Sequence, residues 1–156
     1  MNQREDLIQE LNQLLKGTHM GAFLFEDLRD KLMDRDLKQA FHQYLTLLKE
    51  HEEMITTHIH KLGGESVDHA GVMGTISDVM SMIKNMTLLD DQAVITEAMK
   101  GIEMGMKALR NFDECHFNMS QTLNWELDIM RDDYHIIFHS LHKHGLLRKK
   151  ASSACS

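Results

Sequence analysis

Apolar side chains recur every three or four residues along several stretches of this 156-residue chain, and that period predicts amphipathic helices. No proline interrupts them, and the helix formers Leu, Met, Lys, Glu and Gln are plentiful. The sequence therefore predicts an all-α protein. Long helices are expected over residues 4–33, 37–62, 92–112 and 115–144, with a short helix over 75–86.

Two short polar turns arrange the long helices in pairs. Asp34-Arg35-Asp36 separates the first pair, and Asn111 to Glu114 separates the second. Connections this short make neighbouring helices antiparallel. Gly63-Gly64 ends the second helix and opens a longer link to the third. The expected fold is a ferritin-like four-helix bundle of two antiparallel hairpins, with a short extra helix in the crossover. An up-down array of five helices is the alternative.

The length of the chain fits one domain with its own core. The bundle is expected to cover residues 1–145, with Gly145 ending the last helix. A basic run and then small residues follow, so residues 146–156 are predicted to be a disordered tail.

Charge and cysteine content restrict the partners and the compartment. The formal charge of −7 argues against nucleic acid and anionic membranes, which both require basic surface. No apolar run approaches the roughly 20 residues that span a bilayer. Cys115 and Cys155 form no zinc or redox motif, and a disulfide framework is not expected. These features indicate a cytoplasmic protein.

Histidines on an apolar stripe are the first sign of a functional site. The chain has eleven histidines, and His51 and His58 occupy two positions on the otherwise apolar face of the second helix. A neutral imidazole is a common metal ligand. A single core histidine that is hydrogen-bonded to a neighbour is the alternative.

Counting along the helices from the first turn, at 1.5 Å per residue, suggests which side chains meet. His19 and His51 are expected at the same level near mid-bundle, with Glu103 of the third long helix close by. Two imidazoles and a carboxylate suit Zn²⁺, Fe²⁺ or Mn²⁺. Exposed positions for His19 and Glu103 are the alternative.

Two further groups are weaker candidates. Glu10, His58 and His116 are expected near one end of the bundle, where surface positions are the simpler interpretation. Asp132 and His135 lie on one helical face. They could form half of a metal site, or the carboxylate could orient the imidazole. No catalytic triad, phosphate-binding loop or nucleotide fingerprint accompanies them.

Several motifs also resemble a known family in order and spacing. The chain is similar over about residues 5–143 to the ferritin-like bacterial family catalogued as domain of unknown function 2383. The motifs that carry this resemblance are Leu14 to Met20, Phe25-Glu26, Lys61 to Glu65, Leu88 to Asp91 and Gly101 to Lys107.

The resemblance implies a ferritin-like bundle, and that superfamily holds two metals through glutamates and Glu-x-x-His motifs. This chain departs from the pattern. Leu48 stands three residues before His51, and the nearest form in the last helix is Asp132-x-x-His135. Thr18 and Ile102 occupy positions where the resemblance implies glutamate.

The expected function is therefore transition-metal binding, with iron or zinc, at an altered histidine and carboxylate site. Iron handling or a redox role follows from the superfamily, and zinc follows from the types of ligand. The alternative is a metal-free bundle with a structural role, whose surface serves a homodimer or another protein partner.

Overall fold

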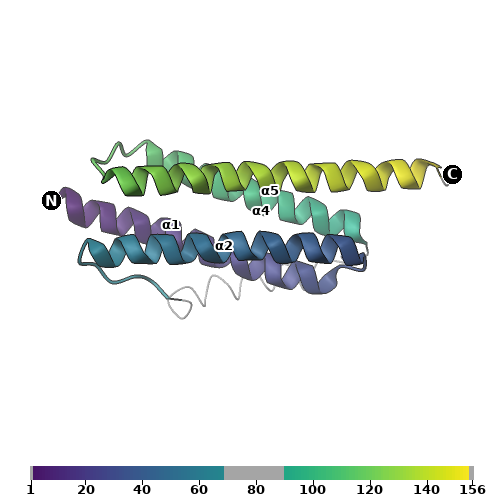
Figure 1. Ribbon diagram of the computed structural model, residues 1–156, viewed down its shortest axis with the longest axis horizontal. Helices are drawn as coiled ribbons and strands as arrows, with labels where there is room; N and C mark the ends of the chain where they lie inside the picture. Colours follow the sequence, from purple (N-terminus) through teal and green to yellow (C-terminus); the bar gives the residue numbers. More distant parts are fainter. Residues whose placement is uncertain (1, 69–89, 155–156) are drawn as a thin grey trace.

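The computed structural model describes residues 2–68 and 90–154 and confirms an all-α four-helix bundle (Figure 1). The short helix predicted over residues 75–86 lies outside the described residues. No helix in the described ranges has the length and apolar character needed to cross a membrane. The helices are α1 (Gln3–Lys31), α2 (Arg35–Lys61), α4 (Asp91–Asp113) and α5 (Gln121–Ala154).

Polar side chains cap three of the helices at their first turns. The Oδ1 atom of Asn2 accepts a hydrogen bond from the backbone N–H of Arg4 at the start of α1, at 3.0 Å. Asp34 and Asp90 cap α2 and α4 in the same way, each at 2.9 Å. These caps satisfy backbone donors that the first turn of a helix leaves unpaired. They explain why α2 begins two residues before the predicted start.

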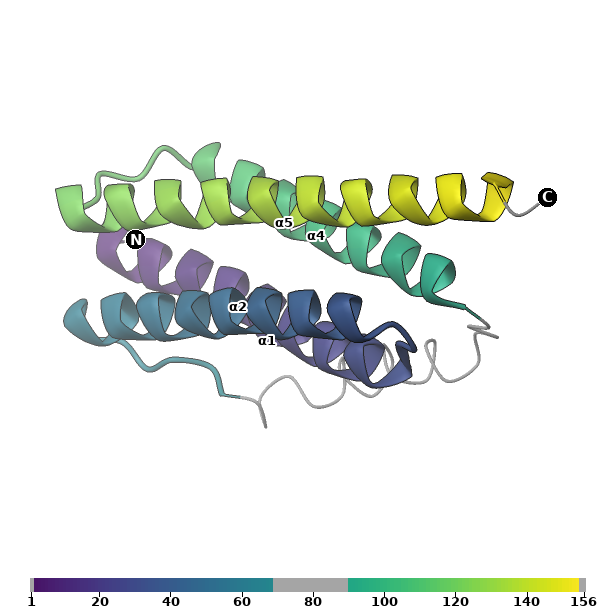
Figure 2. The ribbon, with the colours of Figure 1, turned by 45° about the vertical axis from the view of Figure 1, so that its right-hand side comes forward.

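The two hairpins sit side by side, and all four pairs of neighbouring helices are antiparallel (Figure 2). α1 contacts α2 and α4, and α5 contacts α4 and α2. α4 starts at the turn between α1 and α2, because Asp91 contacts the backbone of Met33 there. α2 and α4 therefore run parallel, as a crossover bundle requires.

Asp91 fixes the start of α4 to the first turn of the bundle. Its carboxylate is only 2% exposed. It accepts hydrogen bonds from the backbone N–H groups of Met33, at 2.8 Å, and Asp34, at 2.9 Å. Arg148 of α5 lies 3.5 Å from the same carboxylate. Three segments that are distant in sequence are therefore joined at one buried charge.

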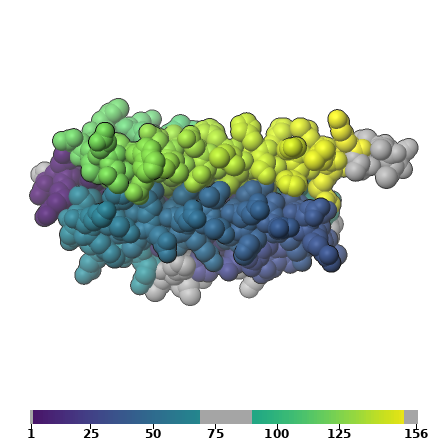
Figure 3. Space-filling view, in the orientation of Figure 1, coloured from purple at the N-terminus to yellow at the C-terminus, as the bar shows by residue number. Residues whose placement is uncertain are grey.

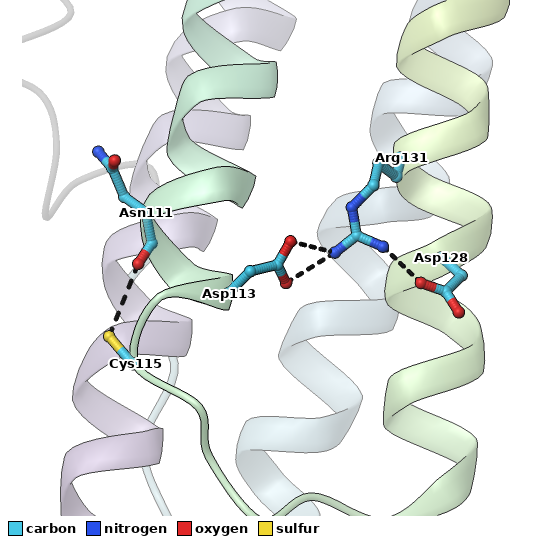
Figure 4. Close-up of polar contacts among 5 residues, drawn as sticks. All are labelled: Asn111, Asp113, Cys115, Asp128 and Arg131. Carbon is cyan, nitrogen blue, oxygen red and sulfur yellow. Dashed lines mark hydrogen bonds and ion pairs between the residues drawn. The ribbon is translucent and has the colours of Figure 1, made fainter.

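The predicted start of α5 at Cys115 is wrong. Residues 116–120 are irregular, and His116 adopts a φ of 51°, which a right-handed helix cannot contain. α5 begins after Ser120, whose hydroxyl accepts a hydrogen bond from the N–H of Leu123 at 3.1 Å. Arg131 then joins α5 to the end of α4 through Asp113 at 2.7 Å, and it also contacts Asp128, one turn earlier on α5 (Figure 4).

The predicted end of α5 at Gly145 is also wrong. The helix continues through residues 146–154, where the sequence suggested a disordered tail, and its end projects beyond the other helices (Figure 1). Gly145 is buried, and a Cβ atom there would lie 3.6 Å from the side chain of Ile95. The residue therefore packs against α4 within the helix and does not terminate it. Arg148, one turn later, reaches Asp34 at 3.6 Å.

The core is mainly apolar and follows the predicted faces of the four helices. Leu11, Leu28, Ile55, Ile137 and Leu141 are completely buried. The aromatic rings of Phe25, Phe41 and Tyr44 form a cluster toward one end, with ring centroids 5.4 to 6.2 Å apart.

Candidate functional site

A row of polar contacts joins α2 to α5. The polar residues of α2 follow one another at steps of seven, and so do their partners on α5. These helices approach each other least closely of the four neighbouring pairs, and they share the face seen in Figure 3. We call the row the polar seam; it comprises the pairs Tyr44–Ser140, His51–Asp133 and His58–Glu126.

His51 occupies the middle of the polar seam and is 4% exposed. Its Nε2 atom lies 2.8 Å from Oδ2 of Asp133. Its Nδ1 atom is buried and has no hydrogen-bond partner within the described part of the chain. Burial lowers the pKa of His51, although the hydrogen bond and charge of Asp133 and the charge of Glu50 act in the opposite direction. The neutral imidazole then donates from Nε2 and keeps a lone pair on Nδ1.

Tyr134 packs edge-on against the His51 ring, with the centroids 5.4 Å apart and the planes at 84°. The Thr18 hydroxyl donates to the carbonyl of Leu14 at 2.9 Å, so its oxygen accepts from the Tyr134 hydroxyl. Burial raises the pKa of Tyr134 to about 12, and the charge of Asp133 acts in the same direction. The Tyr134 hydroxyl is therefore neutral and donates a hydrogen bond, and the Tyr134 ring packs against the ring of His51.

His58 forms the second buried pair of the polar seam. It is 5% exposed, and its Nε2 atom lies 3.1 Å from Oε2 of Glu126. His58 lines a surface groove to which Asn118 and Thr122 also contribute. The Glu126 side chain is 31% exposed, so the His58 pair is more accessible to solvent than the His51 pair.

His19 is buried on the other side of α2, between that helix and the segment that follows it. Its Nδ1 atom lies 2.6 Å from Oε2 of Glu52, and its Nε2 atom lies 3.0 Å from the carbonyl oxygen of Val67. A carbonyl can only accept, so Nε2 carries a proton and Nδ1 shares another with the Glu52 carboxylate. Both ring nitrogens are therefore engaged in hydrogen bonds.

The structure does not bring together the side chains that the helix levels suggested. His19 and His51 contact different carboxylates, and Glu103 is exposed on α4. His58 contacts Glu126, and His116 is exposed in the α4–α5 connection.

Asp132 and His135 are both exposed on α5. Asp133, the residue directly after Asp132, faces His51. No group of three or more His, Cys, Asp or Glu side chains in the described ranges is arranged to hold a metal ion. The carboxylates that do contact the buried histidines are Glu52, Asp133 and Glu126, and none of them was predicted. For Asp133 and Glu126, the seven-residue spacing of polar residues on α2 and α5 was the available signal.

The ligand set of a di-metal ferritin-like centre does not fit the middle of this bundle. Thr18 and Ile102 are buried there, at 2% exposure each, and neither is an ionisable group. Both line an apolar groove of about 260 Å³ between α1 and α4, together with Leu48 and Tyr134. The groove also contains four glycines, at positions 17, 21, 101 and 105.

Comparison with known proteins gives one match. Comparisons with curated proteins and with solved structures return none. A model of the family described as domain of unknown function 2383 matches residues 6–114, about two thirds of the chain. The matched segment contains His19, His51 and His58, whereas Asp133 and Glu126 lie beyond it. Because the match covers more than half of the chain, the protein belongs to that family.

Proposed function

We propose that this protein is a ferritin-like helical bundle that binds a transition-metal ion, with His51 as the principal ligand. One observation carries the proposal. His51 is buried, directs Nε2 at Asp133 and leaves Nδ1 without a hydrogen-bond partner among the described residues. A buried polar atom without a partner is costly, and a bound ion would compensate for it.

The chemistry of the pair suits a metal. A ligating histidine commonly donates its other ring N–H to a carboxylate, which fixes the tautomer and makes the ligating nitrogen more basic. Asp133 stands in that position. The lowered pKa of His51, caused by burial, also favours the neutral imidazole that metals require. Iron and zinc both accept imidazole nitrogen, and water would complete the coordination.

His58 with Glu126 supports a second, weaker position. Seven residues of helix separate His58 from His51, about 10 Å, so the two imidazoles cannot hold one ion. His19 is a poorer ligand than either, because hydrogen bonds engage both of its ring nitrogens. The exposed thiol of Cys115 supports a reducing, cytoplasmic setting for this function.

The second candidate is a metal-free structural or protein-interaction bundle. The specific observation in its favour is that all three buried histidines of the described ranges already contact a carboxylate. Such a pair satisfies an imidazole in a core without any ion.

Elemental analysis of tag-free protein, before and after titration with Fe²⁺ and with Zn²⁺, separates the two candidates. The metal-binding proposal predicts uptake that His51→Ala abolishes and that Asp133→Asn weakens by about 10- to 100-fold. His42→Ala is the matched control, because His42 is exposed on the same helix. Protein that takes up neither metal, or uptake that survives His51→Ala, would overturn the proposal.

A further inference from the structure

α5 carries a line of apolar side chains on the side turned away from the core. Trp125 is 64% exposed, Ile136 60% and Leu146 51%. Ile129 is 40% exposed and lies on the same line. Isolated exposed apolar residues are normal on protein surfaces, but these share one helical face. They need an explanation as a group.

The spacing along this face alternates between four and three residues, as the a and d positions of a coiled coil do. The pattern is separate from the face that α5 buries in the bundle through Leu127, Tyr134 and Leu141. It therefore describes a second packing surface. We call it the outer stripe; it consists of Trp125, Ile129, Asp132, Ile136, His139, Lys143, Leu146 and Lys150.

Charge is distributed unevenly along the outer stripe. The first half carries Asp132, whereas the second half carries Lys143 and Lys150, flanked by Lys149; Asp128, near Asp132, is already paired with Arg131. A parallel pair of such helices would place like charges opposite one another. An antiparallel pair places each acidic half against a basic half, so the charges select the orientation.

We propose that the outer stripe is a docking surface for a second copy of this chain, with the two α5 helices antiparallel about a two-fold axis. One register makes the contacts complementary. Ile129 then packs on Leu146 of the second copy, and Ile136 packs beside His139 of the second copy. Asp132 pairs with Lys143 of the second copy.

The ends of the interface follow from the same register. Trp125 lies against Lys150 of the second copy, a favourable cation–aromatic contact. Two-fold symmetry repeats every pair, as in an isologous interface. From Trp125 to Lys150 the contact extends along about 38 Å of helix. The part of α5 that continues beyond the other helices gives its second half room to meet a partner.

Charge reversal provides a sharp test. Sedimentation of the wild-type protein over a range of concentrations is expected to show a dimer. Asp132→Lys and Lys143→Asp should each weaken association about tenfold or more, since each places like charges opposite one another. An equimolar mixture of the two variants should regain the dimer, because the mixed pair restores opposite charges. Lys107→Asp on α4 is the control and should dimerise normally.

Orientation requires a second measurement. Spin labels attached at Asn124→Cys, in protein that also carries Cys115→Ser and Cys155→Ser, report the distance between copies. The antiparallel register places the labelled backbones about 40 Å apart, whereas a parallel pair would bring them within about 20 Å. A monomeric wild-type protein, a mixture that stays monomeric or the short distance would each overturn the proposal. None of these readouts requires a bound metal.

Discussion

The Nε2 atom of His51 lies 2.8 Å from Oδ2 of Asp133, and this pair joins α2 to α5 at the middle of the bundle. Two opposing influences set the protonation of the imidazole. Burial disfavours its charged form, and the neighbouring carboxylate favours it. Burial is the larger influence, so the pKa of His51 lies below its ordinary value of 6.5. The native protein therefore prefers the neutral ring.

This preference makes folding stability depend on pH. Below about pH 6.5 the unfolded chain protonates His51 while the folded chain does not, so the unfolded state binds more protons. The free energy of unfolding should decrease as the pH falls from 6.5 to the lowered pKa of the native state. Urea unfolding between about pH 5 and 8 measures the effect. His51→Gln should show a smaller decrease over this range, and an identical pH profile would contradict the assignment.

Replacement of Asp91 should be the most damaging single change at a charged residue of the described bundle. Asp91→Ala leaves the N–H groups of Met33 and Asp34 without their acceptor and leaves Arg148 without this partner. We expect a loss of about 3 kcal/mol in the free energy of unfolding.

Two control variants refine the Asp91 measurement. Asp91→Asn keeps one acceptor oxygen and should lose less. Asp36→Ala, at an exposed position in the first turn of α2, should change stability by less than about 0.5 kcal/mol. Equal effects for Asp91→Ala and Asp36→Ala in urea unfolding would show that the buried carboxylate does not hold the three segments together.

Two glycines that line the apolar groove should respond in opposite directions to alanine. A Cβ atom at Gly105 would lie 3.0 Å from Cζ of Tyr134, so Gly105→Ala should cost about 1 to 3 kcal/mol. No heavy atom of the described chain lies within 4 Å of a Cβ atom built at Gly17. Gly17→Ala should therefore gain up to about 1 kcal/mol from helix propensity. Thermal unfolding measures both, and equal shifts in Tm would disprove the difference in packing.

The helices and the core could be predicted from the sequence because both depend on local periodicity. The first and last residues of α5 could not be predicted in this way. The change in backbone direction at His116 has no strong residue signal, and glycine is a common helix terminator, although Gly145 lies within α5 and packs against α4. Ser120 was the available sign of the true start, as a capping residue before an apolar pattern.

The candidate site was predicted only in part, for a geometric reason. The apolar stripe of α2 was sufficient to predict that His51 is buried, whereas the surface position preferred for His58 is wrong, because its ring is buried as well. Their partners depend on how each helix is rotated, and adjacent residues differ by about 100° around a helix. That difference separates Asp133, which contacts His51, from Asp132, which is exposed. The rotation of α4 places Glu103 at the surface in the same way.

The wide spacing of α2 and α5 has a consequence for exchange with solvent. Three polar pairs cross the α2–α5 boundary at regular intervals, whereas α1 and α2, which His19 and Glu52 also join, pack more closely on apolar side chains. Local opening should begin there, because the least apolar contact must be broken. Both hairpins would keep their internal packing during such an opening. Protons and small ions could then reach the buried imidazoles while the fold as a whole stays intact.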